Sequence, residues 1–435
     1  MTISRITRTT TALLVAFSAL VSFPSLSQTK SVKTSPLLVE AAPATVGMSA
    51  ERLNKIDLML KNAVDQKEIP GAVALIVRNG KIVFYNAYGM ADNTTGRAMK
   101  KDDIFRIASQ TKAITATAVM MLWEEGKFNL DDPISKYIPE FGKAQILDTF
   151  NEKDSSYTTK PAKNQITIRH LLTHTSGVGY GAIDNEKFRK IYAKAGITDA
   201  FTTEPVNIAD NIKKLAKLPL HQEPGERWVY SEGLDVLGYL IEIISGMPFD
   251  KFLRTRLFEP LGMNDTYFYI PDNKKNRLVS VQQKTDGEWK KYPGNFFDSD
   301  YPIKGAKTFF SGGGGLSSTA KDYATFLQMY LNGGELNGVR ILSRKTIETI
   351  MANQIGDAWQ GNYQGLAFQV MNQKQQDAGG QGSAGTFQWG GYFNTQYFAD
   401  PKEKLIGILM KQTAGEIKDE TGWRFKLMAE TAIDD

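Results

Sequence analysis

The sequence predicts an α/β fold whose sheet is built from both ends of the chain, with a mostly helical segment inserted between them. Strand-like apolar runs occur near both ends, whereas residues 166–300 show the pattern of helices and long loops. We therefore expect a discontinuous α/β domain over residues 48–135 and 305–435. A mostly helical domain is expected over residues 136–304.

The N-terminal elements follow from local signals. Ser49 precedes apolar residues at the helical period, which predicts a helix to about Lys67. Two β-rich runs then flank Asn79-Gly80, a pair typical of a tight hairpin turn. The next helix begins near Ser109 and is apolar almost all round, which indicates a buried helix.

The remaining chain continues this alternation of helices and strands. The polar, lysine-rich stretch 144–165 is predicted as an exposed insertion, and Thr319 is expected to cap a helix to about Leu331. Residues 342–351 predict another helix. The final elements are predicted as strands Thr386–Trp389, Phe393–Phe398 and Leu405–Met410 and a helix over Gly422–Ala432.

Composition narrows the functional classes. The 435 residues are 42% hydrophobic and 23% charged, as in globular proteins rather than fibrous or disordered ones. The formal charge of +5 is weak and basic residues are dispersed, so nucleic acid is not an expected partner. The absence of cysteine excludes disulfides and thiol nucleophiles, and three histidines make a metal site unpromising. We expect neither a metal nor a cofactor.

Residues 1–27 have the pattern of a secretory signal peptide. Arg5 and Arg8 precede an apolar run of about ten residues, and small residues precede position 28. This run is shorter than the roughly 20 residues of a membrane span. We expect cleavage near Ser27, a linker over 28–47, no stable membrane span afterwards, and a periplasmic or secreted location. An uncleaved N-terminal anchor is the alternative.

A Ser-x-x-Lys pattern runs from Ser109 to Lys112 at a predicted helix start. Residues three positions apart share a helix face, so the lysine amine can take the proton of the serine hydroxyl. The N–H groups and positive dipole end of the helix favour an anionic intermediate there. The pattern alone is not specific, because it also begins at Ser27 and at Ser318. For Ser318, a residue that caps a helix start is the simpler interpretation.

Tyr230 begins a second candidate segment, which is predicted as a helix over Tyr230–Gly246. A phenol beside a lysine cation has a lowered pKa, so Tyr230 is a candidate base. Taken alone, a tyrosine at such a junction is more often an ordinary half-buried aromatic residue. Its assignment therefore depends on its lying close to Ser109.

Trp389-Gly390-Gly391 forms the third candidate segment, at the end of a predicted strand. Two glycines let a substrate lie close against the backbone. The N–H of Tyr392 is then a candidate partner of the Ser109 N–H in an oxyanion hole. A bulge or tight bend is the structural alternative.

Together these motifs resemble those of the penicillin-recognising serine hydrolases, which include class C β-lactamases, DD-peptidases and the β-lactamase-like family VIII esterases. The likeness covers residues 48–430. The resemblance implies an α/β sandwich with an antiparallel sheet flanked by helices and an inserted all-α domain. It also implies that Ser109 is the nucleophile and that Lys112 and Tyr230 assist it. Supporting strings are His170–Gly177, Phe258–Met263 and Gly312–Thr319.

Two departures from the β-lactamase pattern favour the esterase branch. Glu232 stands where β-lactamases have an asparagine that binds the substrate amide. Trp389 and Gly390 stand where a lysine and a threonine hold the β-lactam carboxylate, and an apolar wall fits an ester better. We expect Glu232, Trp389, Gly390 and Gly391 to contact the substrate.

The leading prediction is an exported serine hydrolase that cleaves a small-molecule ester or amide through an acyl-enzyme on Ser109. Which of Lys112 and Tyr230 accepts the proton stays open. The histidines, including His174 in a supporting string, are interpreted as structural or surface residues. One alternative is a β-lactamase or D-amino-acid peptidase that acts on cell-wall-related material. The other is a non-catalytic penicillin-binding-like protein.

Overall fold

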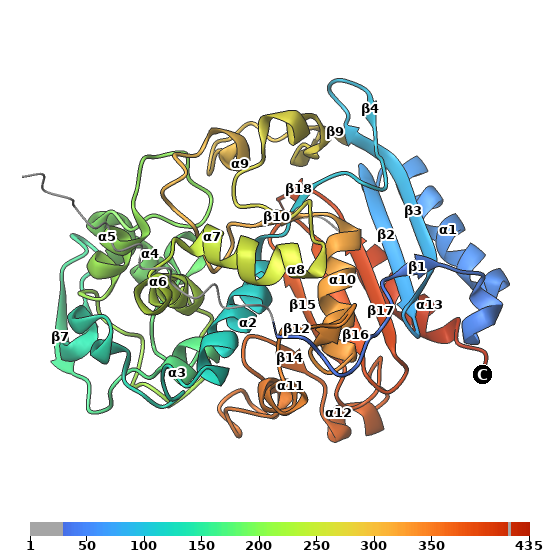
Figure 1. Ribbon diagram of the computed structural model, residues 1–435. Coiled ribbons are helices and arrows are strands. Elements are labelled where there is room, and N and C mark those ends of the chain that lie inside the picture. The colour runs from blue at the N-terminus through green and yellow to red at the C-terminus, as the bar shows by residue number, and fades with distance from the viewer. Residues whose placement is uncertain (1–28, 416–418) are drawn as a thin grey trace, which may run out of the picture.

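A nine-stranded sheet forms the centre of the computed structural model, which describes residues 29–415 and 419–435 (Figure 1). Its strand order is β1-β3-β2-β17-β16-β15-β14-β13, with β4 paired to β3, and only the β1–β3 pair is parallel. Both ends of the chain therefore build one sheet, as predicted. The strands are β1 Val39–Glu40, β2 Gly71–Arg78, β3 Lys81–Asp92, β4 Arg97–Ala98, β13 Tyr363–Gln364, β14 Gln369–Val370, β15 Phe387–Gly391, β16 Thr395–Asp400 and β17 Leu405–Met410.

Helices cover both faces of this sheet, and strand β2 shows why. Successive side chains of a strand point to opposite faces. Val73 and Leu75 join the core cluster that contains α2 and α10, whereas Ala74 and Ile76 join the cluster that contains α1 and α13. A strand that is buried on both faces reads as one continuous apolar run. The covering helices are α1 Ala50–Asp65, α2 Thr111–Glu124, α10 Ala320–Leu331 and α13 Thr421–Thr431.

Local signals place several elements where the sequence predicts them. The Ser49 hydroxyl accepts the Arg52 N–H at 3.3 Å at the start of α1, and Thr319 caps α10 in the same way. Asn79 and Gly80 have φ angles of 48° and 73°, the left-handed pair that a tight hairpin between β2 and β3 requires. Capping and turn chemistry depend on neighbouring residues alone, which explains this agreement.

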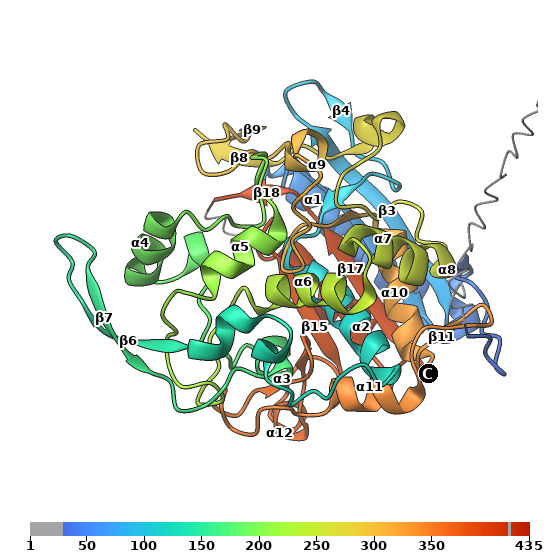
Figure 2. The same cartoon turned by 60° about the vertical axis from the view of Figure 1, so that its left-hand side comes forward.

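The helical part lies beside the sheet (Figure 1). The exposed insertion 144–165 holds an antiparallel strand pair that the sequence did not predict, β6 and β7, and this pair projects from the molecule (Figure 2). The helices are α3 Ile168–Leu172, α4 Glu186–Ala195, α5 Ile208–Leu215, α6 Gly233–Ser245, α7 Phe249–Leu253, α8 Glu259–Leu261 and α9 Tyr301–Lys304. The strands are β6 Gln145–Phe150, β7 Tyr157–Pro161, β8 Gln282–Thr285 and β9 Glu288–Lys291.

Short elements complete the fold. Strand β5 pairs with β10, β11 pairs with β12, and β18 joins β8 and β9. Helix α11 matches the helix predicted near residues 342–351. The bounds are β5 Phe105–Arg106, β10 Ser317–Ser318, β11 Glu335–Leu336, β12 Val339–Arg340, β18 Thr413–Ala414, α11 Arg344–Met351 and α12 Gln373–Asp377.

The N-terminal segment differs in part from the expectation. The predicted signal peptide lies outside the described residues. The predicted linker 28–47 contributes β1 to the sheet, and the Ser35 N–H donates to the buried Glu335 carboxylate at 3.0 Å. This segment is therefore held by backbone pairing, by the Glu335 carboxylate and by the buried side chains of Leu38 and Val46.

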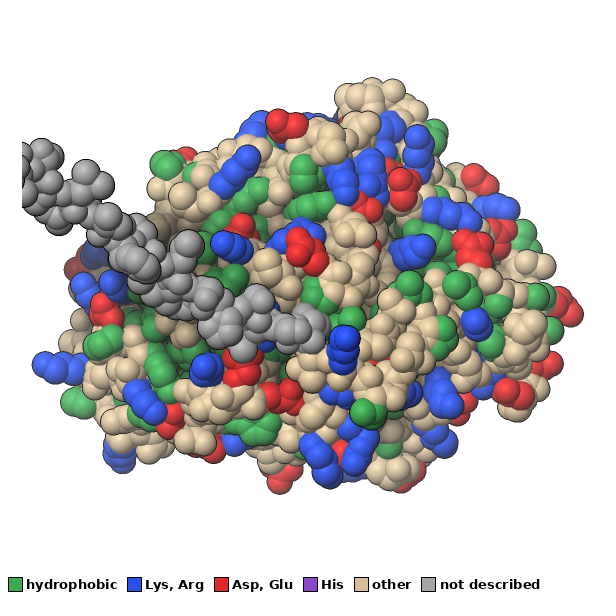
Figure 3. All heavy atoms as spheres, viewed as in Figure 1, with side chains coloured by type: hydrophobic (Ala, Val, Ile, Leu, Met, Phe, Trp, Pro, Cys, Tyr) green, Lys and Arg blue, Asp and Glu red, His purple; other side chains and the backbone are tan. Residues whose placement is uncertain are grey.

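The surface shows no dominant sign of charge on the face in Figure 3, where basic and acidic side chains are interspersed. No helix of the described part is both long and apolar enough to cross a bilayer.

Candidate active site

Ser109 lies in a tight turn, Ala108–Gln110, that leads directly into α2. Ala108 has a φ of 43°, a left-handed conformation that an alanine adopts only when its surroundings hold it there. Strand β15 passes close by, because a Cβ on Gly391 would lie 2.4 Å from the carbonyl oxygen of Ile107. Glycine is therefore required at this crossing, and the buried helix behind Ser109 keeps its hydroxyl in place.

Lys112 lies one turn further along and is almost fully buried. Its Nζ donates to the carbonyl oxygen of Gly313 at 2.7 Å and to Ser109 Oγ and Tyr180 Oη at 3.4 Å each. An ammonium group has three N–H donors, so these three acceptors match its capacity. The Ser-x-x-Lys pattern thus brings its two functional groups together, as the sequence predicts.

Tyr230 also contacts Ser109. Its hydroxyl donates to Ser109 Oγ at 2.6 Å, and Lys112 Nζ lies 4.6 Å from the centre of its ring. The residue lies in the loop before α6 rather than in the helix itself, contrary to the predicted bounds. That loop position lets the side chain point toward α2, so Ser109, Lys112 and Tyr230 form one hydrogen-bonded group.

Two further residues, Tyr180 and Asp235, lie beside this group, and no sequence motif indicated them. The ring of Tyr180 stacks on Tyr230 at 5.1 Å, and burial raises the pKa of Tyr180 well above its usual range. Burial also raises the pKa of Asp235, which accepts the Ser311 O–H at 2.5 Å, while the Lys112 cation opposes that rise. In a single sequence, Tyr180 and Asp235 belong to no recognisable motif and cannot be told from ordinary residues of a buried segment.

A cavity of about 310 Å³, here called the Ser109 cavity, opens beside the serine. Its walls are mainly apolar, with Thr198, Asp199 and Thr202 as polar exceptions. Such a cavity suits a small apolar group attached to a reactive carbonyl. The aromatic rings come from Tyr180, Phe201, Phe296, Phe297 and Tyr392.

Comparisons with known proteins identify the family. A family model described as Beta-lactamase matches residues 56–429. The chain belongs to the beta-lactamase family. It is a hydrolase of this family and has the beta-lactamase/transpeptidase-like fold.

Three similar proteins carry more detailed names. Esterase EstB of Burkholderia gladioli is 29% identical over 83% of this chain and 91% of its own. The lovastatin esterase of Penicillium rubens is 27% identical over 81% of this chain and 91% of its own. The solved structure of EstCE1, described as a hydrolase with promiscuous acyltransferase activity, superposes with a TM-score of 0.73 at 26% identity, covering 88% of this chain and 99% of that chain.

Glu232 of this beta-lactamase family protein does not contact the Ser109 cavity, which corrects the predicted substrate contact. Its side chain is buried, and Oε1 accepts the Gly181 N–H at 3.1 Å. Asp199 Oδ2 accepts the next N–H, that of Ala182, at 2.9 Å. The two carboxyl groups therefore hold the turn that follows Tyr180, because a buried acid must satisfy its oxygens within the protein.

The third motif is divided between two surfaces. The Trp389 ring lies 6.0 Å from that of Tyr230, whereas Trp389 and Gly390 line a second, larger hollow rather than the Ser109 cavity. Tyr392 does line the Ser109 cavity, and within the described chain its N–H has no hydrogen-bond acceptor. This N–H is thus available for an anionic oxygen.

The histidines occupy structural positions. His174 is buried, its Nδ1 accepts the Ser231 N–H at 3.3 Å, and burial together with the Lys112 cation holds its pKa well below its usual range. His221 Nε2 lies 2.9 Å from Asp184 Oδ2, and His170 Nδ1 accepts a backbone N–H. Among the described residues, no group of three His, Asp or Glu side chains is arranged to hold a metal ion.

Glu232 provides a prediction about stability and pH. Burial and the neighbouring carboxyl of Asp199 raise the pKa of Glu232 well above its ordinary value of 4.5. The folded chain therefore binds this proton more tightly than the unfolded chain, and the resulting stability is lost as the pH rises above about 4.5. Glu232→Gln keeps an acceptor for the Gly181 N–H and has no proton to lose. We expect the difference in Tm, variant minus parent, to be about 1–3 °C larger at pH 8 than at pH 5.

Differential scanning calorimetry at both pH values measures this difference. The matched control is Glu204→Gln, which alters an exposed glutamate. Identical pH dependence of the Tm for the Glu232→Gln variant and its parent would contradict the assignment of a buried, protonated carboxyl.

Proposed function

We propose that this protein is an exported serine esterase that cleaves small carboxylic esters through an acyl-enzyme on Ser109. One observation carries the proposal: Ser109 Oγ lies 2.6 Å from Tyr230 Oη and 3.4 Å from Lys112 Nζ, beside a mainly apolar cavity. The signal-peptide pattern of residues 1–27 supports export. The names of EstB and the lovastatin esterase support ester cleavage.

In the acylation step, Ser109 Oγ attacks the ester carbonyl carbon and its proton passes to Tyr230 Oη. Tyr230, the nearer group, accepts this proton as a phenolate and becomes a neutral phenol, and the Lys112 cation beside its ring stabilises the phenolate before the transfer. The N–H groups of Ser109 and Tyr392 stabilise the negative oxygen of the tetrahedral intermediate. The carbon–oxygen bond to the alcohol then breaks, and the departing alkoxide takes the proton from Tyr230.

In the deacylation step, water attacks the acyl carbon and transfers a proton to Tyr230. The bond to Ser109 Oγ breaks, the serine regains the proton, and the carboxylic acid leaves. Neither step requires a metal or another cofactor, because the protein groups supply the proton acceptor and the oxyanion donors.

The preference for esters over β-lactams rests on the third motif. Trp389 and Gly390 provide neither a cation nor a hydroxyl that would hold a β-lactam carboxylate. Glu232, at the position of the amide-binding asparagine, is turned inward to Gly181. Neither position therefore supplies the contact that a β-lactam needs.

A hydrolysis panel tests the proposal. We expect kcat/KM for p-nitrophenyl acetate and butyrate to exceed that for a chromogenic cephalosporin and a D-Ala-D-Ala peptide by about 100-fold or more, because the cephalosporin and the peptide carry a carboxylate for which Trp389 and Gly390 supply no cation or hydroxyl, whereas the esters need no such contact. A preference for the cephalosporin or the peptide would overturn the esterase assignment. Labelling by a serine-reactive phosphonate without turnover of any substrate would instead favour a non-catalytic binding protein.

A further inference from the structure

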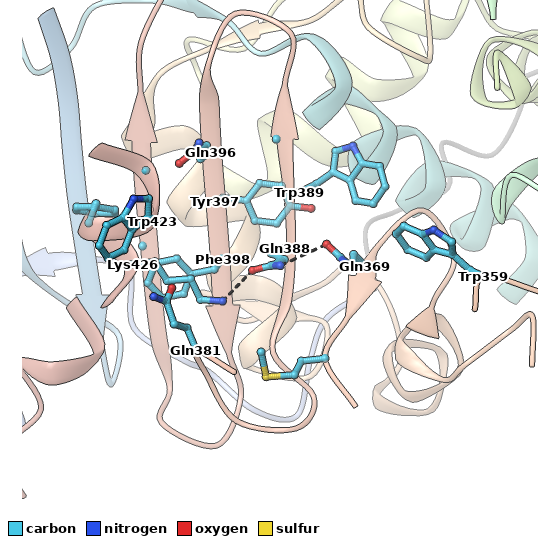
Figure 4. A pocket seen from close by; sticks show the side chains of 15 residues that line it. Trp359, Gln369, Gln381, Gln388, Trp389, Gln396, Tyr397, Phe398, Trp423 and Lys426 are labelled. Carbon is cyan, nitrogen blue, oxygen red and sulfur yellow. Dashed lines mark hydrogen bonds between the residues drawn. The ribbon is translucent and has the colours of Figure 1, made fainter. Parts of the chain in front are cut away.

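A second hollow of about 690 Å³, here called the outer-face groove, lies on the sheet face beside α13 (Figure 4). Figure 4 shows Trp423 of α13 on one side of it and Trp359 and Trp389 on the other. Gln388 and Gln396 belong to the neighbouring strands β15 and β16, which form the floor. Its volume falls within the usual range for ligand sites, roughly 300–1,000 Å³.

Amide side chains supply most of the polar groups in a groove whose lining is otherwise largely aromatic and apolar. Gln388 is fixed, because its Oε1 accepts from Lys426 Nζ at 2.8 Å and its Nε2 donates to Gln369 Oε1 at 3.3 Å. Gln381 and Gln396 also line the groove, and their side-chain amides make no hydrogen bond to another residue in the described chain. Each such amide offers two donors and an acceptor oxygen to a ligand.

The charge of the groove is low. Among the described residues that line it, Lys426 is the one charged side chain. Its Nζ is bound to Gln388 and lies 4.0 Å from Glu430 Oε1, and burial lowers the pKa of Lys426. A polyanion therefore finds no cluster of free cations here, and an apolar ligand would leave the amides unpaired.

The aromatic residues define the shape of the ligand. Trp423 is 52% exposed, a large apolar side chain that lines the groove instead of packing in the core. A flat ring with a polar edge suits a ligand that has apolar faces and hydrogen-bonding edges. Sugar rings have this character, since C–H groups cover their faces and hydroxyl groups surround their edges.

The strand pairing disfavours an extended peptide. Peptides that add to a sheet need a free strand edge. The floor of the groove is instead a sheet face, because Gln388 is paired with both Gln369 of β14 and Phe398 of β16. We propose that the outer-face groove binds a neutral oligosaccharide, with Trp423 stacking on a sugar ring and Gln381 and Gln396 bonding its hydroxyl groups.

Calorimetric titration of the full chain tests this proposal. The Ser109→Ala variant is the parent protein, so that binding is measured without turnover and independently of the esterase proposal. The probes are maltotetraose, cellotetraose and N-acetylchitotetraose, with a neutral tetrapeptide and a sulfated oligosaccharide for comparison. We expect at least one neutral tetrasaccharide to bind and to be weakened about ten-fold by Trp423→Ala and also by Gln396→Leu.

The matched control is Leu427→Ala, which removes another exposed apolar side chain from α13 without changing the lining of the groove. We expect its Kd to stay within about two-fold of the parent value. The proposal fails if no neutral tetrasaccharide binds at about 10 mM, a concentration that detects very weak sites. It also fails if Trp423→Ala and Gln396→Leu leave binding unchanged, or if the tetrapeptide or the sulfated sugar binds more tightly.

Discussion

Replacing Ser109 with alanine is expected to reduce kcat/KM for p-nitrophenyl butyrate by about 10⁴- to 10⁶-fold, since the acyl-enzyme cannot form without the hydroxyl. The change should cost little stability, because Ser109 is partly exposed and, among the residues that the structure describes, its Oγ is bonded only to Lys112 and Tyr230. Initial rates over a range of substrate concentrations measure the effect, together with the loss of phosphonate labelling detected by intact-protein mass spectrometry.

The chain supplies a matched control in Ser318, which begins another Ser-x-x-Lys pattern. The Ser318 hydroxyl is buried and lies 2.8 Å from Thr266 Oγ1, and Lys321 is exposed. Ser318→Ala should therefore retain activity and lose only stability, by about 1 kcal/mol. Retained ester hydrolysis in Ser109→Ala, or its loss only in Ser318→Ala, would refute the choice of nucleophile.

Tyr230→Phe is expected to lower kcat by about 10²- to 10⁴-fold while KM changes little, because a general base acts on the transition state. The substitution removes one oxygen and leaves the ring, so the stacking on Tyr180 and the packing on His174 persist. Single-turnover measurements that separate acylation from deacylation should show both steps slowed, since the same oxygen moves the proton in each.

The control for Tyr230 is its stacked neighbour. Tyr180→Phe also removes one phenolic oxygen, which lies 3.4 Å from Lys112 Nζ but makes no hydrogen bond to Ser109 in the described structure. We expect about a ten-fold loss, the size of one lost hydrogen bond to a charged group. A larger effect of Tyr180→Phe than of Tyr230→Phe would contradict the assignment of Tyr230 as the proton acceptor. It would indicate that Tyr180 has this role.

Much of the fold follows from patterns of neighbouring residues. Ser49 and Thr319 start helices because a side-chain oxygen can cap nearby N–H groups, and Asn79-Gly80 turns because both residues adopt a left-handed conformation. Tyr230 differs, because an apolar run predicts a helix from its periodicity but does not locate its first turn. The structure starts that helix at Gly233 and leaves Tyr230 free to reach Ser109.

Ser109, Lys112 and Tyr230 could be predicted as a site from the sequence alone, because their motifs are typical of one chemistry and of one family. Their surroundings could not be predicted and are known from the tertiary structure. It brought Tyr180 to Lys112 and turned Glu232 away from the cavity toward Gly181. The physical reason is that a motif describes residues that are near in the chain, whereas hydrogen bonds, burial and pKa shifts depend on which distant segments pack together.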